Sequence, residues 1–182
     1  MNEVKVGIIG IGNMGSAHLH SVTAGNIPGM RVTAVCDINP EKLKAAKTEY
    51  PDIAAFGDYT ELLKSSDTNA VIIAVPHPLH AKIAIEAFKY GKHVLVEKPI
   101  DITVSAAEGL CAAAKKSGRV FAIMFNQRTN GLFRKAREIV KSGELGKLKR
   151  SVWIMTTGTE RRAITIRAIG APHGAARAAE CF

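Results

Sequence analysis

The chain has 182 residues, of which 47% are hydrophobic and 23% are charged, an ordinary composition for a globular protein. This length allows one full core, or one domain and part of another. The formal net charge of +9 would suit nucleic acid, but much of the excess lies in residues 134–150, where no aromatic side chains are interleaved for base stacking. We therefore interpret it as a solvated basic surface rather than a polyphosphate site, and expect no nucleic-acid partner.

The sequence shows no targeting or membrane segment. An apolar strand pattern begins by Val4 without a basic leader, and no apolar run approaches the roughly 20 residues of a membrane-spanning helix. Cys36, Cys111 and Cys181 are an odd number of cysteines, and their spacing fits neither a metal site nor a redox pair. We expect a cytoplasmic protein without membrane contact and without a bound metal.

The first predicted element is a strand that leads into a glycine-rich turn. Val4–Ile9 is apolar and rich in β-branched residues, as in a strand buried on both faces. Gly10, Gly12 and Gly15 then have the Gly-x-Gly-x-x-Gly spacing that lets a pyrophosphate approach the backbone. A helix beginning near Met14 would present its N-terminus to the phosphates. The alternative is a glycine-rich turn without a ligand.

The second predicted strand ends in a carboxylate. Arg31–Asp37 is short and apolar, and Asp37 lies close to the roughly 20-residue offset expected for the acid that binds the adenosine ribose. This favours NAD(H) over NADP(H), because a carboxylate repels a 2′-phosphate and residues 38–40 contain no arginine to compensate. The alternative is that Asp37 merely caps the helix that begins at Pro40.

Strands and helices alternate along the rest of the first 125 residues. Further strands are predicted over 53–56, 70–75, 93–96 and 120–125, and helices over 16–24, 40–49, 79–90 and 104–116, with a short helix after Asp58. This alternation predicts an α/β fold with a doubly wound parallel sheet, which binds ligands at the carboxyl ends of its strands. Beyond it, apolar residues from Leu132 to Val140 predict an amphipathic helix.

The loop after the strand over 70–75 is one candidate for chemistry. Pro76 begins a stiff, proline-rich connection that would form a wall beside the nicotinamide. His80 would lie in the first turn of the next helix, where the helix dipole keeps its ring neutral, although a packing role is an equal alternative. For His77 a packing role is favoured, and His18 and His20 have no predicted partners.

The loop after the next strand contains Glu97, Lys98 and Pro99. A lysine at the end of a buried strand, held by a following proline, is directed toward the cleft. Its ammonium would hydrogen-bond a substrate hydroxyl while hydride leaves the same carbon. Glu97 would pair with Lys98 or contact the nicotinamide ribose. The alternative is a surface turn containing an ion pair.

Together these segments resemble the family of glucose–fructose oxidoreductase, inositol dehydrogenase and MocA-like proteins. The resemblance covers about residues 4–157 and depends on Gly10-Ile11-Gly12-Asn13-Met14-Gly15, Asp37, Pro76, His80, Gly91–Pro99 and Asn126–Arg128. It implies an NAD(P)-binding Rossmann domain over residues 1–125, followed by an open, mostly antiparallel sheet that forms the substrate site and usually a homo-oligomer interface.

The resemblance also implies an activity and the residues behind it. The activity is oxidation of a hydroxyl on a sugar, inositol or related polyol, with NAD as the expected coenzyme and NADP less favoured. Lys98 takes the catalytic position, and Arg128 lies near the cleft as a candidate substrate ligand. The six residues from Gly10 to Gly15, together with Asp37, Pro76, His80, Glu97 and Lys98, are the expected coenzyme contacts.

Residues 126–182 depart from the family pattern. Ser151–Thr157 would be the first strand of an α+β substrate domain, but the sequence from about residue 160 is an alanine, glycine and arginine tail without a clear period. We expect a truncated domain, from a frameshift after Ala163 or in a deliberately short protein. Two functions follow: a polyol or sugar dehydrogenase, or an NAD(H)-binding module without turnover. A methyltransferase is disfavoured by the Glu97-Lys98-Pro99 step.

Overall fold

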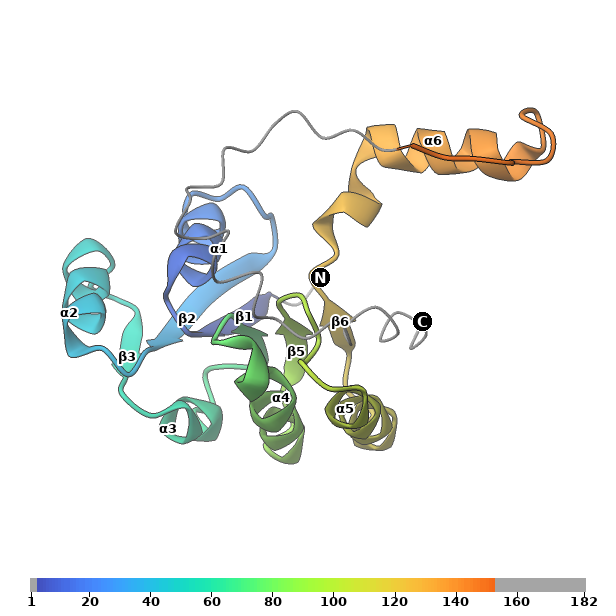
Figure 1. Ribbon diagram of the computed structural model, residues 1–182. Coiled ribbons are helices and arrows are strands. Elements are labelled where there is room, and N and C mark those ends of the chain that lie inside the picture. The colour runs from blue at the N-terminus through green and yellow to red at the C-terminus, as the bar shows by residue number, and fades with distance from the viewer. Residues whose placement is uncertain (1–2, 153–182) are drawn as a thin grey trace, which may run out of the picture. The chain divides into compact units, whose positions relative to one another are not determined.

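The computed structural model describes residues 3–152, which divide between Met124 and Phe125 into two units (Figure 1). The first unit contains a six-stranded sheet in the order β3-β2-β1-β4-β5-β6, and all five strand pairs are parallel. The strands are β1 (Val4–Ile9), β2 (Met30–Cys36), β3 (Ala54–Phe56), β4 (Ala70–Ile73), β5 (His93–Val96) and β6 (Phe121–Ile123). This order is that of a doubly wound Rossmann fold, which confirms the predicted fold class.

Helices cover both faces of the sheet (Figure 1). In the view of Figure 1, α1 and α2 lie on one face, and α3, α4 and α5 lie on the other. Their bounds are α1 (Asn13–Thr23), α2 (Pro40–Glu49), α3 (Tyr59–Lys64), α4 (His80–Lys89) and α5 (Val104–Ser117), with a 3₁₀ turn, η1 (His77–Leu79), before α4. Right-handed crossovers between neighbouring parallel strands produce this three-layer arrangement.

The predicted boundaries differ from the observed ones mainly at the carboxyl edge of the sheet. β4 ends at Ile73 instead of Val75, because the Val75 carbonyl accepts a hydrogen bond from the His80 ring instead of extending the ladder. α1 begins at Asn13, three residues before the predicted start, because the glycine turn leads directly into the helix. The strand predicted over 151–157 is absent at Ser151 and Val152, and the remaining residues lie outside the described range.

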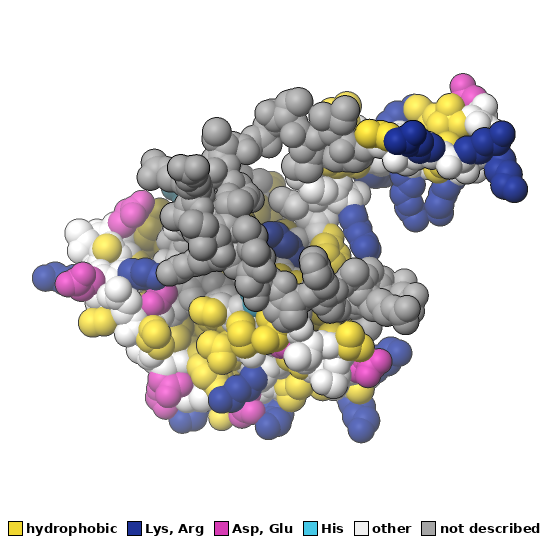
Figure 2. Space-filling view, in the orientation of Figure 1, with side chains coloured by type: hydrophobic (Ala, Val, Ile, Leu, Met, Phe, Trp, Pro, Cys, Tyr) yellow, Lys and Arg dark blue, Asp and Glu magenta, His cyan; other side chains and the backbone are white. Residues whose placement is uncertain are grey.

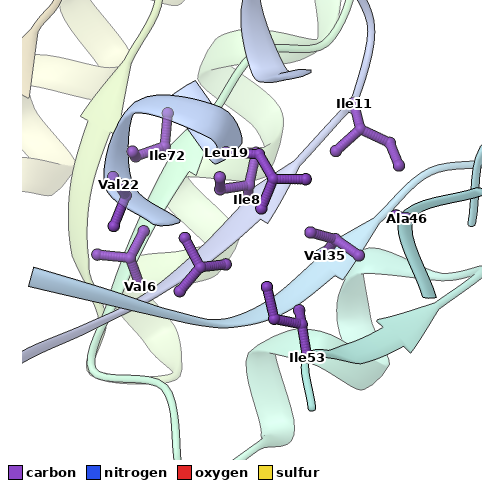
Figure 3. Packing of buried hydrophobic residues seen from close by; sticks show 10 residues of the cluster. Val6, Ile8, Ile11, Leu19, Val22, Val35, Ala46, Ile53 and Ile72 are labelled. Carbon is purple, nitrogen blue, oxygen red and sulfur yellow. The ribbon is translucent and has the colours of Figure 1, made fainter. Parts of the chain in front are cut away.

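The core of the first unit lies between the sheet and its helices. Val6 and Ile8 of β1 pack with Val35 of β2, and Leu19 and Val22 of α1 cover them (Figure 3). Each of these side chains is at most 5% exposed. Burying one such side chain contributes about 1.5–3 kcal/mol. This packing fixes α1 against β1, and therefore fixes the glycine turn between them.

The Gly91–Pro99 segment that resembles the family has roles at both edges of the sheet. At the start of β5, Lys92 is 7% exposed, and its ammonium donates to the carbonyls of Ser65 (2.6 Å) and Thr68 (2.5 Å). Burial lowers the pKa of Lys92. The first half of the segment therefore joins β5 to the loop after α3, and only the second half reaches the ligand-binding edge.

The second unit, as far as it is described, contains the 3₁₀ turn η2 (Asn126–Thr129) and the helix α6 (Gly131–Ser142). Asn130 caps α6 by accepting from the Leu132 N–H at 2.9 Å. The helix is amphipathic, as predicted, but Leu132 and Val140 of its apolar stripe are 81% and 46% exposed. Figure 2 shows lysine and arginine side chains next to hydrophobic side chains along α6. Within residues 3–152, none of the helices has both the length and the apolar character needed to cross a bilayer.

Candidate functional site

The glycine turn between β1 and α1 is held tightly by its neighbours. Gly10 has a φ of 89°, a left-handed conformation that favours glycine, and its N–H donates to the Cys36 carbonyl at 2.7 Å. A Cβ on Gly10 would lie 2.8 Å from the Ala74 carbonyl oxygen. A Cβ on Gly15 would lie 1.8 Å from the Gly10 oxygen. The fold itself therefore requires glycine at both positions.

Gly12 differs, because nothing in the described part of the chain requires a glycine there. Its φ is −74°, which any residue adopts, and apart from its chain neighbours no atom of residues 3–152 lies within 4 Å of the position of an added Cβ. Gly12 is the N-cap of α1, and no side chain caps this helix. The first N–H groups of the helix, at Asn13, Met14 and Gly15, have no carbonyl partner within it. The turn therefore leaves open space beside unpaired donors, an arrangement that fits a bound anion.

Asp37 lies directly after β2 and faces the same turn. It is 9% exposed, and its Oδ2 accepts from the Ile11 N–H at 3.0 Å while its Oδ1 accepts from the Asn39 N–H at 2.9 Å. Asn39, not Asp37, caps α2, since its side chain accepts from the Glu41 N–H. The alternative that Asp37 serves as the helix cap is therefore wrong. Oδ1 keeps one lone pair, which can accept a hydrogen bond from a ribose hydroxyl.

Two residues near Asp37 have roles that the sequence did not reveal. Ile11 is 5% exposed and gives its N–H to Asp37, so it positions the carboxylate and has no free N–H for a phosphate. Lys42, on the first turns of α2, places its ammonium 3.5 Å from Asp37 Oδ2. Although residues 38–40 contain no arginine, a cation therefore lies beside this carboxylate. The sequence contained a hint of this cation, because Lys42 lies four residues, about one helical turn, after Ile38, the residue that follows Asp37.

A pocket of about 450 Å³ extends from the glycine turn along the carboxyl edge of the sheet. Its walls are mostly apolar, and they include Pro76 as predicted for the loop after β4. Cys36 also lines the pocket, and burial together with the negative charges of Asp58 and Asp37 raises the pKa of its thiol to about 12. The thiol therefore stays protonated and serves as a small apolar wall. Further lining residues are Gly10, Gly12, Asp37, Ile38, Tyr59, Leu79 and Ile83.

His80 occupies a different environment from the one predicted. It is 0% exposed, its Nδ1 lies 2.7 Å from the Pro99 carbonyl oxygen, and its Nε2 lies 2.9 Å from that of Val75. Both ring nitrogens therefore face backbone carbonyl oxygens. The ring is fully buried and offers no surface to a coenzyme, so the expectation that it contacts the nicotinamide is wrong. His80 instead joins the loop after β4 to the loop that contains Lys98.

Glu97 is paired with a residue that the sequence left without a partner. Its Oε1 lies 2.7 Å from His18 Nε2, and the two side chains are 7% and 17% exposed. Glu97 Oε2 accepts from the Lys98 N–H at 3.2 Å. The expectation that the Glu97 carboxylate pairs with the Lys98 ammonium is therefore wrong, and so is the expectation that His18 stands alone.

Lys98 itself is exposed, and among residues 3–152 its ammonium has no ion pair or hydrogen bond. One ionisable group that interacts electrostatically with Lys98 is His77, in the loop after β4. Burial, and then the positive charges of His80 and Lys98, lower the pKa of His77, so this ring stays neutral near pH 7. The structure thus brings His77 beside Lys98, where sequence analysis favoured a mere packing role.

Asp101 is a further residue that sequence analysis missed. It is 6% exposed, and its Oδ2 accepts from the Ala81 N–H in the first turn of α4, while its Oδ1 accepts from the Ile102 N–H at 2.7 Å. Together with the His80 ring, it ties the Glu97–Pro99 loop to α4 by two separate contacts. No local sequence pattern predicts this contact, because Asp101 and Ala81 come from different elements.

Arg128 belongs to the second unit, where its guanidinium lies 4.5 Å from the centre of the Phe125 ring. A hollow of about 950 Å³ lies along α6 in that unit, and its lining includes Arg128, Arg134, Arg137 and Lys141. The predicted role of Arg128 in binding a substrate stays a prediction.

The parallel sheet, the glycine turn at its switch point and the carboxylate after β2 define a dinucleotide-binding Rossmann protein. A sequence model of the oxidoreductase family with an NAD-binding Rossmann fold, the Gfo/Idh/MocA family, matches residues 4–125. The chain belongs to this NAD-binding oxidoreductase family, as the sequence motifs predicted.

Individual relatives agree with this assignment. The chain is 34% identical over 145 residues to inositol 2-dehydrogenase of Salmonella typhimurium, covering 79% of this chain and 43% of that protein. It is 31% identical over 144 residues to an uncharacterized oxidoreductase of Bacillus subtilis, covering 79% and 42%. The crystal structure of scyllo-inositol dehydrogenase from Lactobacillus casei, with bound NAD(H) and scyllo-inositol, is similar with a TM-score of 0.75 at 29% identity, covering 80% and 43%. The chain thus spans less than half the length of these relatives.

Proposed function

We propose that the first unit binds NAD(H) and that the protein oxidises a hydroxyl group of a sugar, inositol or related polyol. Residues 1–125 would form the coenzyme domain, and residues from 126 onward would begin the substrate and oligomerisation domain. The inositol dehydrogenase relatives support this substrate class. A cytoplasmic location, a homo-oligomer and the absence of a nucleic-acid partner remain predictions.

The observation that carries the proposal is the open space at Gly12 beside the uncapped N-terminus of α1. The protein does not fill this space, and the donors around it suit a pyrophosphate. The proposed coenzyme contacts continue along the carboxyl edge: Asp37 at the adenosine ribose, Pro76 as a wall of the pocket and Glu97 beside the nicotinamide ribose. Gly10, Ile11, Asn13, Met14 and Gly15 shape or supply the phosphate turn.

Lys98 is the proposed catalytic residue. The bound coenzyme supplies a nicotinamide ring that accepts hydride from the substrate carbon. Lys98 would hydrogen-bond the substrate hydroxyl and take up its proton as an uncharged amine. Among residues 3–152, Lys98 has no carboxylate partner that would compete with a substrate hydroxyl for its side chain. Arg128 is the proposed substrate ligand of the second unit.

The second candidate is an NAD(H)-binding module without turnover. It would require only the glycine turn and the Asp37 carboxylate of the first unit. Titration with NADH, followed by fluorescence, tests the coenzyme site shared by both candidates. An assay of NAD⁺ reduction with a panel of sugars and inositols then separates them. Binding with turnover supports the dehydrogenase, binding alone supports the module, and no binding contradicts both.

Replacing the proposed catalytic lysine should separate chemistry from binding. Wherever turnover is observed, Lys98→Met should lower kcat by about 10²–10⁴, the usual contribution of a positioned acid or base. NADH affinity should change much less than kcat, because Lys98 provides no part of the phosphate turn. Lys64→Met is the matched control, since Lys64 is an exposed lysine paired with Glu61 on α3, and it should change neither quantity. Full activity in Lys98→Met would contradict the assignment.

Asp37 should control the choice between the two coenzymes. We expect the wild type to bind NADH more tightly than NADPH, because the carboxylate accepts from a ribose hydroxyl and repels a 2′-phosphate. Asp37→Ser should weaken NADH binding by about tenfold, from the loss of a hydrogen bond to a charged group. It should strengthen NADPH binding, because Lys42 then lacks its carboxylate partner.

Parallel titrations with NADH and NADPH measure this preference. Asp67→Ser is the matched control, since Asp67 is an exposed acid that pairs with Lys5 away from the site. An unchanged preference in Asp37→Ser would show that the coenzyme ribose does not meet this carboxylate.

A further inference from the structure

The Glu97 carboxylate has a histidine, and not its neighbouring lysine, as the side-chain partner of one oxygen. Lys98, its neighbour in sequence, is the nearest candidate for an ion pair, yet Glu97 Oε1 is bound by His18 Nε2 at 2.7 Å. The other oxygen, Oε2, accepts from the backbone N–H of Lys98, not from its ammonium. A carboxylate oxygen can only accept, so Nε2 of His18 bears the hydrogen of this contact.

His18 and Glu97 come from the two elements on which the proposed site depends. His18 lies on α1, one turn after the glycine loop, and Glu97 follows β5 directly. Both side chains are largely buried, so water does not substitute easily for either partner. The His18–Glu97 pair therefore joins the coenzyme-binding helix to the loop that contains Lys98.

We propose that His18 is a positioning residue that holds Glu97 away from the Lys98 side chain, and so leaves the Lys98 ammonium without a carboxylate partner. The inference rests on the proposed function only in one respect, the catalytic role assigned to Lys98. If His18 were unable to donate, Glu97 Oε1 would lose its partner, and Lys98, whose backbone N–H already binds Oε2, carries the cation that is adjacent in the chain.

The consequence for Lys98 follows from ordinary electrostatics. A carboxylate within about 4–6 Å favours the charged form of an amine and raises its pKa by roughly one unit or more. His77 interacts electrostatically with Lys98, but its lowered pKa leaves it uncharged near pH 7, so it does not offset such a carboxylate. An upward shift of one unit leaves about tenfold less free amine at neutral pH. Such a lysine would be a poorer acceptor for a substrate proton.

The reactivity of Lys98 measures this effect without coenzyme or turnover. The full chain is exposed briefly to acetic anhydride over a range of pH, and acetylation of the peptide that contains Lys98 is quantified by mass spectrometry. We expect His18→Phe to move the pH midpoint of labelling upward by about one unit, with about tenfold slower labelling at neutral pH. His18→Gln, whose amide can still donate to Glu97, should retain a midpoint near that of the wild type.

Two controls separate this effect from a general disturbance of α1. His20→Phe makes the same change at an exposed position of the same helix and should leave the midpoint unchanged. In a Glu97→Gln background, His18→Phe should have no further effect, because no carboxylate is left to release. A thermal unfolding curve shows that each variant is folded. If His18→Phe is unfolded, the comparison of His18→Gln with His18→Asn, whose shorter amide does not reach Glu97, provides the same test.

An unchanged midpoint in folded His18→Phe, or an equal shift in the Glu97→Gln background, would overturn the inference. The outcome is independent of the proposed function, which NADH titration tests separately. A shifted midpoint without NADH binding would retain the His18–Glu97–Lys98 relation and remove the coenzyme site. NADH binding without a shift would do the reverse.

Discussion

Gly15→Ala is expected to destabilise the first unit by about 3 kcal/mol or more, which is at the upper end of the cost of overpacking. The new methyl group would lie 1.8 Å from the backbone oxygen of Gly10. Gly10 cannot give way, because its N–H is bound to the Cys36 carbonyl and its other side faces the Ala74 carbonyl. The clash between the new methyl group and the Gly10 oxygen can therefore be avoided only if α1 moves away from β1. That movement opens the core around Leu19.

Urea unfolding followed by circular dichroism measures this loss. Gly109→Ala in α5 is the matched control, since it is the same change in a helix and no atom lies within 4 Å of the new Cβ. We expect Gly109→Ala to be as stable as the wild type, or up to about 1 kcal/mol more stable, because alanine is the better helix former. Equal midpoints for the two variants would show that the contact between Gly10 and Gly15 is not rigid.

Gly12→Val should have the opposite result, an intact fold with impaired binding. Among residues 3–152 nothing within 4 Å opposes the new side chain, and the φ of −74° suits it, so the loss of stability should not exceed about 1 kcal/mol, the usual cost of an apolar residue at an N-cap. The valine would fill the space beside the uncapped N-terminus of α1. A pyrophosphate could then no longer approach the backbone, and NADH affinity should fall by about a hundredfold, or roughly 2.8 kcal/mol.

Titration of NADH against Gly12→Val, with Gly109→Ala as the folded reference, measures this loss. Together the two predictions distinguish a structural glycine from a ligand-binding one. Gly15→Ala should lose stability in urea, whereas Gly12→Val should lose NADH affinity. If Gly12→Val binds NADH as the wild type does, the coenzyme does not reach this turn. The central support for the proposed function would then be lost.

Periodicity and turn residues were sufficient to predict the fold. Strands β1 and β5 and helix α2 have the predicted bounds, because their apolar runs are closed by a glycine, a proline or a cap such as Asn39. The errors of two residues or more lie at the ends of β4 and β6 and at the start of α1. At β4, the Val75 carbonyl contacts the His80 ring, a contact that the local sequence does not reveal.

The site was predicted less completely than the fold. Gly10, Gly12, Asp37 and Pro76 line one pocket at the carboxyl edge, and the NAD-binding family is confirmed. The partners of these residues were often wrong. Glu97 has a sequence neighbour of opposite charge, yet it is bound by His18, 79 positions away along the chain. His80 lies in the first helical turn as expected, but its ring is buried between two carbonyls instead of facing the pocket.

By itself, the sequence determined the order of elements, the glycine turn, the carboxylate after β2 and the family of oxidoreductases. These features depend on short-range conformational preferences, on residue spacing within one loop, or on motifs that can be recognised before any contact between elements is known. Only the tertiary structure decided which glycine is needed by the fold and which leaves room for a ligand, and which cation holds Glu97. Such choices depend on distances between atoms from different elements, and the packing of helices on the sheet sets those distances.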